Sequence, residues 1–370
     1  MLAPNRNLLP TDAQIGIEPE FDFRSAEYCA FHNLGRATVF QSPSWLDAVH
    51  RKLMPHLSAR QYTLTIRNLD HELLAVIPLV LQRSRGLSML MPADFGVSDY
   101  NAIVADPAML EILAADPSVI DRIDRLLDVA DLLIFRKVRH DGFDARRLFR
   151  KTVASANENA AYHSETGADF EVWQRQTISK KYSNELRRLG RQIERDFGSY
   201  ELRPAQSEAE VRDAFRFLKS ARDGRFDGDF LDNPVYEQFY CDYAVAGLAS
   251  GDAMTYVSYL NGEPVAVLFG PACEDEFHAV LIGSDMQRFG KYSIGMQLIY
   301  RVIKFRFDHG LHRLDLGLGN TGYKSLFRVE ETCLRNFTSS RSLAGSMISF
   351  VYHRAKPFKN ALGRFSPHVR

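Results

Sequence analysis

Strand-like and helix-like apolar periodicities alternate along this chain, most clearly in its second half. Residues 277–285 (FHAVLIGSD) place apolar side chains at every second position, which predicts a strand. Residues 286–295 (MQRFGKYSIG) are polar, basic and glycine-containing, which predicts a turn. Residues 296–310 have helical spacing, and residues 313–319 (RLDLGLG) return to strand spacing. The polar residues 320–324 (NTGYK) then close the unit.

A hairpin is expected before this unit. Residues 255–260 and 264–270 both have strand character, and Asn261-Gly262 between them accepts the positive φ angles of a tight hairpin turn. The second half therefore reads as hairpin, strand, loop, helix and strand.

The first half repeats this order, which suggests a duplication of the supersecondary unit with negligible sequence identity between the copies. The expected counterparts are the strands 61–67 and 73–81 joined by a turn at 68–70, the strand 88–94, the helix 118–130 and the strand 132–138. Only the second copy has a glycine-bearing turn that opens its helix.

The boundary between the halves is expected in residues 152–167, which are rich in small and polar residues and poor in apolar periodicity. This gives an N-terminal domain over 1–160, a C-terminal domain over 161–340 and a basic tail over 341–370. The tail has six basic residues and no acidic ones, so we consider peripheral contact with a membrane or with another protein.

Composition narrows the class of protein. The chain has 370 residues, which is enough to bury two substantial cores. Its formal net charge is zero, so no overall electrostatic attraction to nucleic acid or to an anionic membrane is expected. The apolar run 73–81 is too short to span a bilayer and contains Pro78. The four cysteines are isolated and no signal peptide is recognised, which together predict a cytoplasmic protein.

The glycine turn is the strongest candidate for chemistry. A turn of this kind that opens a helix directs free backbone N–H groups and the positive end of the helix dipole outward, which suits a pyrophosphate. Gly290, Ser293 and Gly295 let the backbone approach closely, and Arg288 and Lys291 add positive charge.

Several motifs occur in an order that resembles one acyltransferase family. The most specific are FQSPSW (40–45), SDY (98–100) and the pattern DL-x-x-G-x-x-x-YK over 315–324. Together they resemble the CelD/BcsL type of the GNAT superfamily, named for cellulose biosynthesis and similar in architecture to the Fem-type aminoacyltransferases of peptidoglycan. The resemblance covers roughly residues 35–340 and implies an α/β fold with mixed sheets, built as two tandem GNAT-like domains.

The resemblance also implies an acyltransferase that takes acetyl-CoA or another acyl-CoA. Its acceptor would be an amine or hydroxyl of a carbohydrate or cell-envelope (exopolysaccharide) precursor, attacked directly in a ternary complex without a metal. The expected cofactor-binding residues are Leu281, Ile282, Gly283, Arg288, Gly290, Lys291, Tyr292, Ser293, Ile294, Gly295 and Asn320.

Acyl transfer from a thioester needs a path for the nucleophile's proton, donors for the oxyanion and a proton for the departing thiolate. We expect a backbone N–H near 281–283 as oxyanion donor. Asp315 is the first candidate for base or substrate orienter, and a purely structural carboxylate is the alternative. Tyr323 is placed to protonate the thiolate, and Lys324 to pair with phosphate or with Asp315. His278 and Asp285 are reserve candidates, because strand alternation decides which side chains face the substrate.

Residues 175–195 predict a basic helix, with seven Lys or Arg against two Glu. It is either a solvated face or a channel for an anionic substrate. The substrate-binding candidates are Lys180, Lys181, Arg187, Arg188 and Arg191 in this helix, and Asp99 and Tyr100 in the first half.

Two other functions stay open: a Fem-like transferase that uses aminoacyl-tRNA, with RNA on the basic helix, and a non-catalytic GNAT scaffold in polysaccharide synthesis. Two further readings are set aside. The Gly317–Gly322 match to G-x-G-x-x-G lacks the acidic residue and the chain length of a dinucleotide-binding fold. His309 and His312 lie where a helix ends, with no third metal ligand nearby. DNA binding is not expected.

Overall fold

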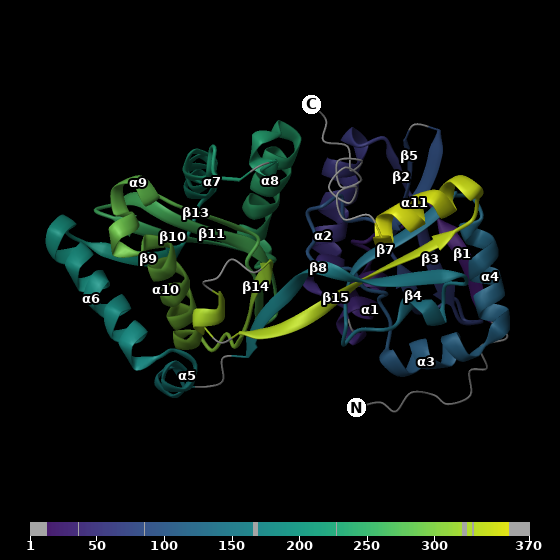
Figure 1. Cartoon of the computed structure of the whole chain (residues 1–370), viewed down its shortest axis with the longest axis horizontal. Helices are drawn as coiled ribbons and strands as arrows, with labels where there is room; N and C mark the ends of the chain where they lie inside the picture. Colours follow the sequence, from purple (N-terminus) through teal and green to yellow (C-terminus); the bar gives the residue numbers. More distant parts are fainter. Residues whose placement is uncertain are drawn as a thin grey trace. The chain divides into compact units, whose positions relative to one another are not determined.

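A computed structural model describes residues 13–35, 37–84, 86–165, 169–226, 228–319, 324–327 and 329–354 (Figure 1). The chain divides into two units. Unit 1 contains residues 1–158 and 333–370, and unit 2 contains residues 159–332. Helices and sheets occur in both units, so the predicted mixed α/β fold class is confirmed.

Unit 1 has two sheets. The smaller sheet has the antiparallel order β1-β3-β4, and the larger one the order β2-β5-β6-β7-β15. In the larger sheet β6 runs parallel to β7, while β5 and β15 run antiparallel to their neighbours β6 and β7. The strands are β1 (Gln14–Glu18), β2 (Ala59–Gln61), β3 (Thr63–Arg67), β4 (Leu73–Ile77), β5 (Leu79–Ser84), β6 (Leu87–Pro92), β7 (Leu132–Arg139) and β15 (Glu330–Ser340).

Unit 1 has a core that includes Leu64, Leu90, Ile123 and Phe135. The helices of unit 1 are α1 (Ala26–Leu34), α2 (Pro43–Ala48), α3 (Pro107–Ala115), α4 (Pro117–Leu127) and α11 (Leu343–Arg354), with short turns of helix η2 (Val39–Gln41), η3 (Val49–Leu53), η4 (Met54–His56) and η5 (Ala145–Arg147). The helix expected at 118–130 is α4, and the strand expected at 132–138 is β7.

Pro78 divides the strand that was expected over 73–81. β4 ends at Ile77 and pairs with β3, whereas β5 begins at Leu79 and pairs with β2 and β6 in the other sheet. The expectation of one strand was therefore wrong. Proline has no N–H for a ladder and a fixed φ, so the chain changes sheets at this residue.

The segment in which the domain boundary was expected, residues 152–167, contains the strand β8 (Thr152–Glu165). The chain leaves unit 1 within β8 and returns to it within β15. Backbone hydrogen bonds form a ladder whatever the side chains are, so a run of Ala, Asn and Ser without apolar alternation is compatible with a strand.

Unit 2 has the strand order β8-β14-β12-β11-β10-β9, and β13 pairs with β11 beside this path. Its strands are β9 (Tyr200–Pro204), β10 (Ala253–Leu260), β11 (Glu263–Cys273), β12 (Glu276–His278), β13 (Leu281–Ser284) and β14 (Arg313–Leu318). Its helices are α5 (Phe170–Thr177), α6 (Lys180–Phe197), α7 (Glu208–Arg222), α8 (Pro234–Ser250), α9 (Met286–Phe289) and α10 (Ile294–Asp308), with short turns η6 (Phe230–Asp232), η7 (Gly290–Tyr292) and η8 (Lys324–Phe327).

The β10–β11 hairpin turns at Asn261 and Gly262, whose φ angles are +51° and +85°. The predicted Asn-Gly hairpin is therefore confirmed, since both central residues of such a turn need positive φ.

Two helical layers cover the β9–β13 strands, with α7 and α8 on one side and α10 and α6 on the other (Figure 1). β11 shows the alternation that supports both layers. Leu268 belongs to the cluster beneath α10, while the Phe269 ring lies 5.1 Å from that of Phe215 in α7. Successive side chains of a strand point to opposite faces, so β11 is apolar at every position between the layers.

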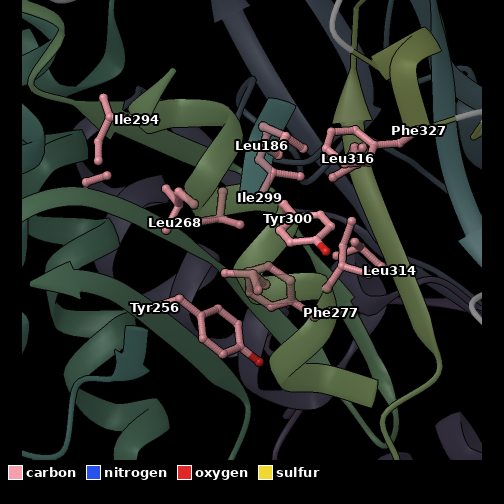
Figure 2. Packing of buried hydrophobic residues seen from close by; sticks show 14 of the residues in the cluster. Leu186, Tyr256, Leu268, Phe277, Ile294, Ile299, Tyr300, Leu314, Leu316 and Phe327 are labelled. Atoms are coloured by element: carbon pink, nitrogen blue, oxygen red, sulfur yellow. The ribbon is translucent and has the colours of Figure 1, made fainter. Parts of the chain in front are cut away.

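Figure 2 shows the core beneath α10. Phe277 of β12 and Leu314 and Leu316 of β14 converge with Ile299 and Tyr300 of α10. This packing fixes which face of each strand is turned toward α10, and it therefore decides the direction of the polar residues between them.

Candidate active site

The strand expected over 277–285 is interrupted in its middle. β12 ends at His278 and β13 begins at Leu281. A Cβ on Gly270 of β11 would lie 1.7 Å from the His278 carbonyl oxygen, so β11 and β12 approach too closely for any other residue. The Val280 N–H bonds to the Phe269 oxygen at 3.0 Å, one residue out of the register of β13 with β11. This irregularity is a β-bulge. It bends the chain after β12 away from β14, the neighbour on the side opposite β11.

The consequence is a separation of two parallel strands. β12 pairs with β14 at Glu276–Arg313, Phe277–Leu314 and His278–Asp315, and one further bond joins the Ala279 N–H to the Asp315 oxygen at 2.8 Å. Beyond that point β13 pairs only with β11, and β14 continues beside β8. Among the described residues, no strand occupies the second edge of β13.

Ile282 presents its backbone to this edge. The Asp285 N–H bonds to the Val265 oxygen on β11, and bonded residues alternate along an antiparallel strand, so Gly283 also faces β11 while Ile282 faces away. The Ile282 carbonyl accepts a hydrogen bond from Arg222 Nη1 at 2.7 Å, which agrees with that direction. The open edge therefore presents backbone groups of the kind that pair with an extended amide-containing ligand.

Arg222 and Asp229 were not found from the sequence, yet they border this edge. Arg222 Nε donates to Asp229 Oδ2 at 2.7 Å, and the side chains are 12% and 3% exposed. Asp229 Oδ1 also accepts from the Leu231 N–H. These residues lie at the end of α7 and in the polar loop after it, where apolar periodicity carries no signal.

The turn after β13 is mostly helical. Asp285 caps α9 by accepting from the Arg288 N–H at 2.9 Å, and its carboxylate also pairs with the Arg288 guanidinium. The turn of η7 follows, and Ser293 takes a left-handed conformation with φ +54°. α10 then begins at Ile294, two residues before the expected start of the helix.

The N-terminus of α10 has no side-chain cap from Ser293. The Ser293 carbonyl accepts from the N–H groups of Met296 and Gln297. The first two N–H groups of the helix, those of Ile294 and Gly295, have no backbone acceptor among the described residues. They carry the positive end of the helix dipole.

Gly295 packs this helix end against the end of β13. A Cβ at Gly295 would lie 3.3 Å from Ser284 Oγ, which is tighter than an ordinary contact. The open edge of β13 and the free N–H groups of α10 are therefore adjacent. An edge for an amide chain beside donors for an anion fits the pantetheine and pyrophosphate of an acyl-CoA.

His278 and Asp315 mark the point where the strands separate. Their neighbours Phe277 and Leu314 point toward α10, so alternation turns His278 and Asp315 to the opposite face. His278 Nδ1 lies 3.6 Å from Asp315 Oδ2, and the two side chains are 0% and 2% exposed. The structure thus brings two of the predicted catalytic residues together and buries both.

Asp315 and Lys324 both bind the backbone of the turn that follows β14. Asp315 Oδ1 accepts from the Gly317 N–H at 2.7 Å, and Gly317 has a φ of +73°. The buried Lys324 ammonium donates to the Gly317 and Leu318 carbonyls at 2.9 and 2.8 Å. The ammonium is thus enclosed by backbone oxygens, not exposed for a phosphate. Two further residues of the predicted site, Asn320 and Tyr323, lie outside the described residues.

Tyr292, expected to bind cofactor, lies in the core and donates to Asp196 Oδ2 at 3.0 Å. Lys291 is exposed, and its ammonium lies 4.9 Å from the Tyr292 ring centre. Because Arg288 is paired with Asp285, Lys291 is the basic side chain of this turn with most freedom to meet an anion.

The basic helix expected over 175–195 is α6, and it begins only at Lys180 because α5 precedes it. The inner face of α6 carries the buried side chains of Leu186, Leu189 and Ile193. The side-chain amide of Gln297 in α10 donates to the Leu186 carbonyl at 2.6 Å. On the outer face, acidic partners bind Arg187 and Arg188. The exposed Lys180, Lys181 and Arg191 make no ion pair within the described part of the chain.

Asp99 and Tyr100 belong to unit 1, whereas the turn and the open edge belong to unit 2. Tyr100 is buried, and its carbonyl accepts from Gln41 of the FQSPSW motif at 3.2 Å. Trp45 of the same motif donates to Ser98 Oγ at 2.9 Å. The two motifs of the first half thus bind each other inside unit 1.

Close to them, Asp94 is fully buried and binds Arg136 through both oxygens. Burial opposes the charge of Asp94, but Arg136 and Lys137 outweigh it and lower the pKa of the carboxyl to about 2. This network has the character of a structural core and not of a ligand-contacting surface.

No group of three or more His, Cys, Asp or Glu side chains within the described ranges is arranged to hold a metal ion. Among the helices that the structure describes, none has the length and apolar character needed to cross a membrane.

Solved structures resemble the fold over most of this chain. The crystal structure of FemX matches with a TM-score of 0.61 and 10% identity, over 88% of this chain and 97% of that one. The C-terminal domain of a putative lysylphosphatidylglycerol synthetase from Agrobacterium fabrum matches with a TM-score of 0.51 and 12% identity, over 84% and 95%. L-PGS from Bacillus licheniformis matches with a TM-score of 0.50 and 14% identity, over 83% and 94%. At these identities the similarity concerns the fold.

No curated protein matches the sequence. Residues 180–325 match the family model of the acetyltransferase (GNAT) domain. This range runs from α6 into η8 and contains the separated strands, the turn and α10. This part of the chain is therefore similar to GNAT-type acetyltransferase domains.

Proposed function

We propose that unit 2 transfers an acyl group from acyl-CoA, with acetyl-CoA as the first candidate, to an amine or hydroxyl. One observation carries the proposal: β12 and β14 pair as far as His278 and Asp315 and then separate, leaving the second edge of β13 beside the uncapped start of α10. Such an edge suits the amides of a pantetheine arm, and free helical N–H groups suit its pyrophosphate.

The roles of the residues follow from their directions. The Ile282 N–H shares the open edge with the Ile282 carbonyl and is the proposed donor for the oxyanion. The N–H groups of Ile294 and Gly295, with Lys291 nearby, bind the diphosphate. The nucleophile adds to the thioester carbonyl, the C–S bond then breaks, and the proton lost by the nucleophile balances the one gained by the departing thiolate.

Asp315 acts as a positioning residue in this proposal. Its carboxylate is buried and already binds the Gly317 N–H, so its effect on the thioester passes through the turn and through the separation of the strands. In this proposal, water or Tyr323 transfers the proton. Tyr323 is a candidate because it belongs to the DL-x-x-G-x-x-x-YK pattern over 315–324.

The acceptor and the location remain proposals as well. The resemblance to CelD/BcsL proteins supports a carbohydrate or cell-envelope precursor, and the four isolated cysteines support the cytoplasm.

The experiment is a thermal shift of the full chain with acetyl-CoA, since a ligand that binds the native state raises the unfolding temperature. We expect a shift in the wild type and little or none in Gly295→Glu, which adds bulk and negative charge beside the proposed diphosphate site. Ala209→Glu, at an exposed position in the first turn of α7, is the matched control for added charge. Equal shifts in the wild type and in Gly295→Glu contradict the assignment.

A Fem-like transfer from aminoacyl-tRNA is the second candidate. The chain matches FemX over 97% of that structure, and α6 exposes Lys180, Lys181 and Arg191 without acidic partners among the described residues. Binding of tRNA that weakens steeply with salt, together with no response to acetyl-CoA, favours this candidate.

A further inference from the structure

Two arginine side chains lie against the second edge of β13. Ile282 and Ser284 both turn their backbone groups away from β11, because bonded residues alternate along an antiparallel strand. Arg222 Nη1 donates to the Ile282 carbonyl at 2.7 Å, and Arg225 Nη1 lies 3.4 Å from the Ser284 carbonyl. The outward carbonyls thus have guanidinium partners, so the edge presents N–H donors and positive charge, which suit the oxygen atoms of a ligand.

The two arginines differ in what balances their charge. Arg222 is nearly buried and pairs with Asp229, whereas Arg225 is exposed and has no carboxylate partner among the described residues. Arg225 Nη1 contacts the Ala221 and Ser284 carbonyls at 3.5 and 3.4 Å, which is long for a hydrogen bond. Its other N–H groups meet no acceptor in the described part of the chain. Arg225 therefore keeps most of its donors for a ligand.

The chain turns sharply after α7 and places Arg225 at this edge. Gly224 has a φ of +66°, and the Arg225 N–H returns to the Arg222 carbonyl at 3.0 Å. The half-exposed Phe226 ring has its centre 4.3 Å from the guanidinium carbon of Arg222 and 5.8 Å from that of Arg225. Contact with a ring orients a guanidinium without using its N–H groups.

Ser284 connects Arg225 with the start of α10. Its carbonyl contacts Arg225, and its Oγ would lie 3.3 Å from a Cβ at Gly295. A single residue therefore lies between the Arg225 guanidinium and the first N–H groups of α10. Lys291, in the turn before α10, supplies a second exposed cation. Backbone donors and cations from two separate parts of the chain thus lie close together.

We propose that Arg225 binds the diphosphate of the acyl donor together with the start of α10. The inference rests on the proposed function and adds to it a residue from the loop after α7, which the sequence did not indicate. A guanidinium presents a planar fork of N–H groups that matches two phosphate oxygens. Binding exchanges two long contacts with neutral carbonyls for charge-assisted hydrogen bonds, which are stronger.

Position along β13 favours the donor over the acceptor as the ligand of Arg225. The proposed oxyanion donor is the Ile282 N–H, so the thioester and the attacking acceptor belong near that residue. Ser284 lies about 7 Å further along the strand. It is the residue that contacts α10, so a phosphate at the start of α10 is within reach of Arg225.

The test is isothermal titration calorimetry of the full chain with CoA and with dephospho-CoA. Dephospho-CoA keeps the diphosphate and lacks the separate phosphate on the ribose, so the pair of ligands distinguishes the two groups. Arg225→Gln should weaken the binding of both about tenfold and make it less sensitive to salt, because one charge-assisted contact is lost. Arg225→Lys should recover part of the affinity, since it keeps the charge without the fork.

Two controls separate phosphate binding from a structural role. Arg216→Gln removes an exposed arginine from the same helix, α7, and affinity for CoA should stay unchanged. Pantetheine, which has no phosphate, should raise the unfolding temperature of the wild type and of Arg225→Gln equally. Without ligand, the two proteins should unfold at the same temperature, because Arg225 is exposed.

The outcomes distinguish this inference from the proposed function. A wild type that binds neither CoA nor dephospho-CoA overturns both. Binding by the wild type with equal affinity in Arg225→Gln overturns the role of Arg225 alone. A loss confined to CoA assigns Arg225 to the ribose phosphate and overturns the diphosphate assignment. A smaller response of Arg225→Gln to pantetheine overturns it too, because Arg225 would then act through the shape of the edge.

Discussion

His278 and Asp315 are register partners on two parallel strands, with His278 Nδ1 3.6 Å from Asp315 Oδ2. They are the last register pair before β12 and β14 part. The buried contact therefore closes the paired region at the place where the open edge of β13 begins. Substitutions here test whether the contact positions the strands or carries proton transfer.

Asp315→Asn should retain turnover within about tenfold, because the amide oxygen can still accept from the Gly317 N–H. Asp315→Ala removes that acceptor and should lower the free energy of unfolding by about 1–3 kcal/mol while turnover falls strongly. Turnover and chemical denaturation of both variants check the prediction. If Asp315→Asn alone loses about 10² to 10⁴ in rate with its stability intact, proton transfer belongs to Asp315.

The pair of Arg222 and Asp229 should be costly to break. Arg222→Met leaves the buried Asp229 carboxylate without its cation and removes the donor to the Ile282 carbonyl, so we expect a loss of about 3–5 kcal/mol in the free energy of unfolding. Urea denaturation measures it.

Arg216→Met in the same helix is the matched control. Arg216 pairs with Asp213 through side chains that are 72% and 55% exposed, so its loss should stay below about 1 kcal/mol. Equal losses in Arg216→Met and Arg222→Met would show that the edge contact adds nothing to stability.

Because His50 is buried, we expect the stability of unit 1 to fall at acidic pH. Burial lowers the pKa of His50 from 6.5 to about 4, although its Nδ1–H donates to the Leu46 carbonyl at 2.7 Å. The unfolded chain takes up this proton below pH 6.5, whereas the native protein resists until about pH 4. The contribution of His50 to stability is therefore lost as the pH falls through that window.

The loss amounts to about 3 kcal/mol for a depression of this size. We expect the unfolding free energy of the wild type to fall by about that much more between pH 7 and pH 4 than that of His50→Gln, which does not titrate. Denaturation curves across the window measure the difference. Parallel pH profiles of the two proteins would contradict the buried neutral state of His50.

We expect any polyanion binding by α6 to depend mainly on Lys180, Lys181 and Arg191, since Arg187 and Arg188 have acidic partners. Lys180→Ala/Lys181→Ala/Arg191→Ala is expected to reduce the slope of log affinity for tRNA against log salt by up to about 2–3. Filter binding across a salt series measures the slope. Arg187→Ala/Arg188→Ala is the comparison variant, and a larger effect from it would show that its ion pairs open for the ligand.

Some of this protein was determined by the sequence itself. The hairpin at Asn261-Gly262, the helix α4 and the strand β14 follow from turn chemistry and periodicity, because both act over a few neighbouring residues. The mixed α/β class follows from the alternation of such elements.

Other features were decided only by the tertiary structure. The break between β12 and β13 depends on the close approach at Gly270, and β8 is a strand because distant strands offer it backbone partners. Arg222 reaches Ile282 across sixty positions of the chain, and no local pattern encodes that contact.

The face that His278 and Asp315 share was also decided by the tertiary structure. The sequence named His278 and Asp315 as candidates, but not which face they share, since strand alternation leaves two choices. Packing of Phe277 and Leu314 beneath α10 makes the choice, because burying those apolar side chains forces their neighbours to the opposite face.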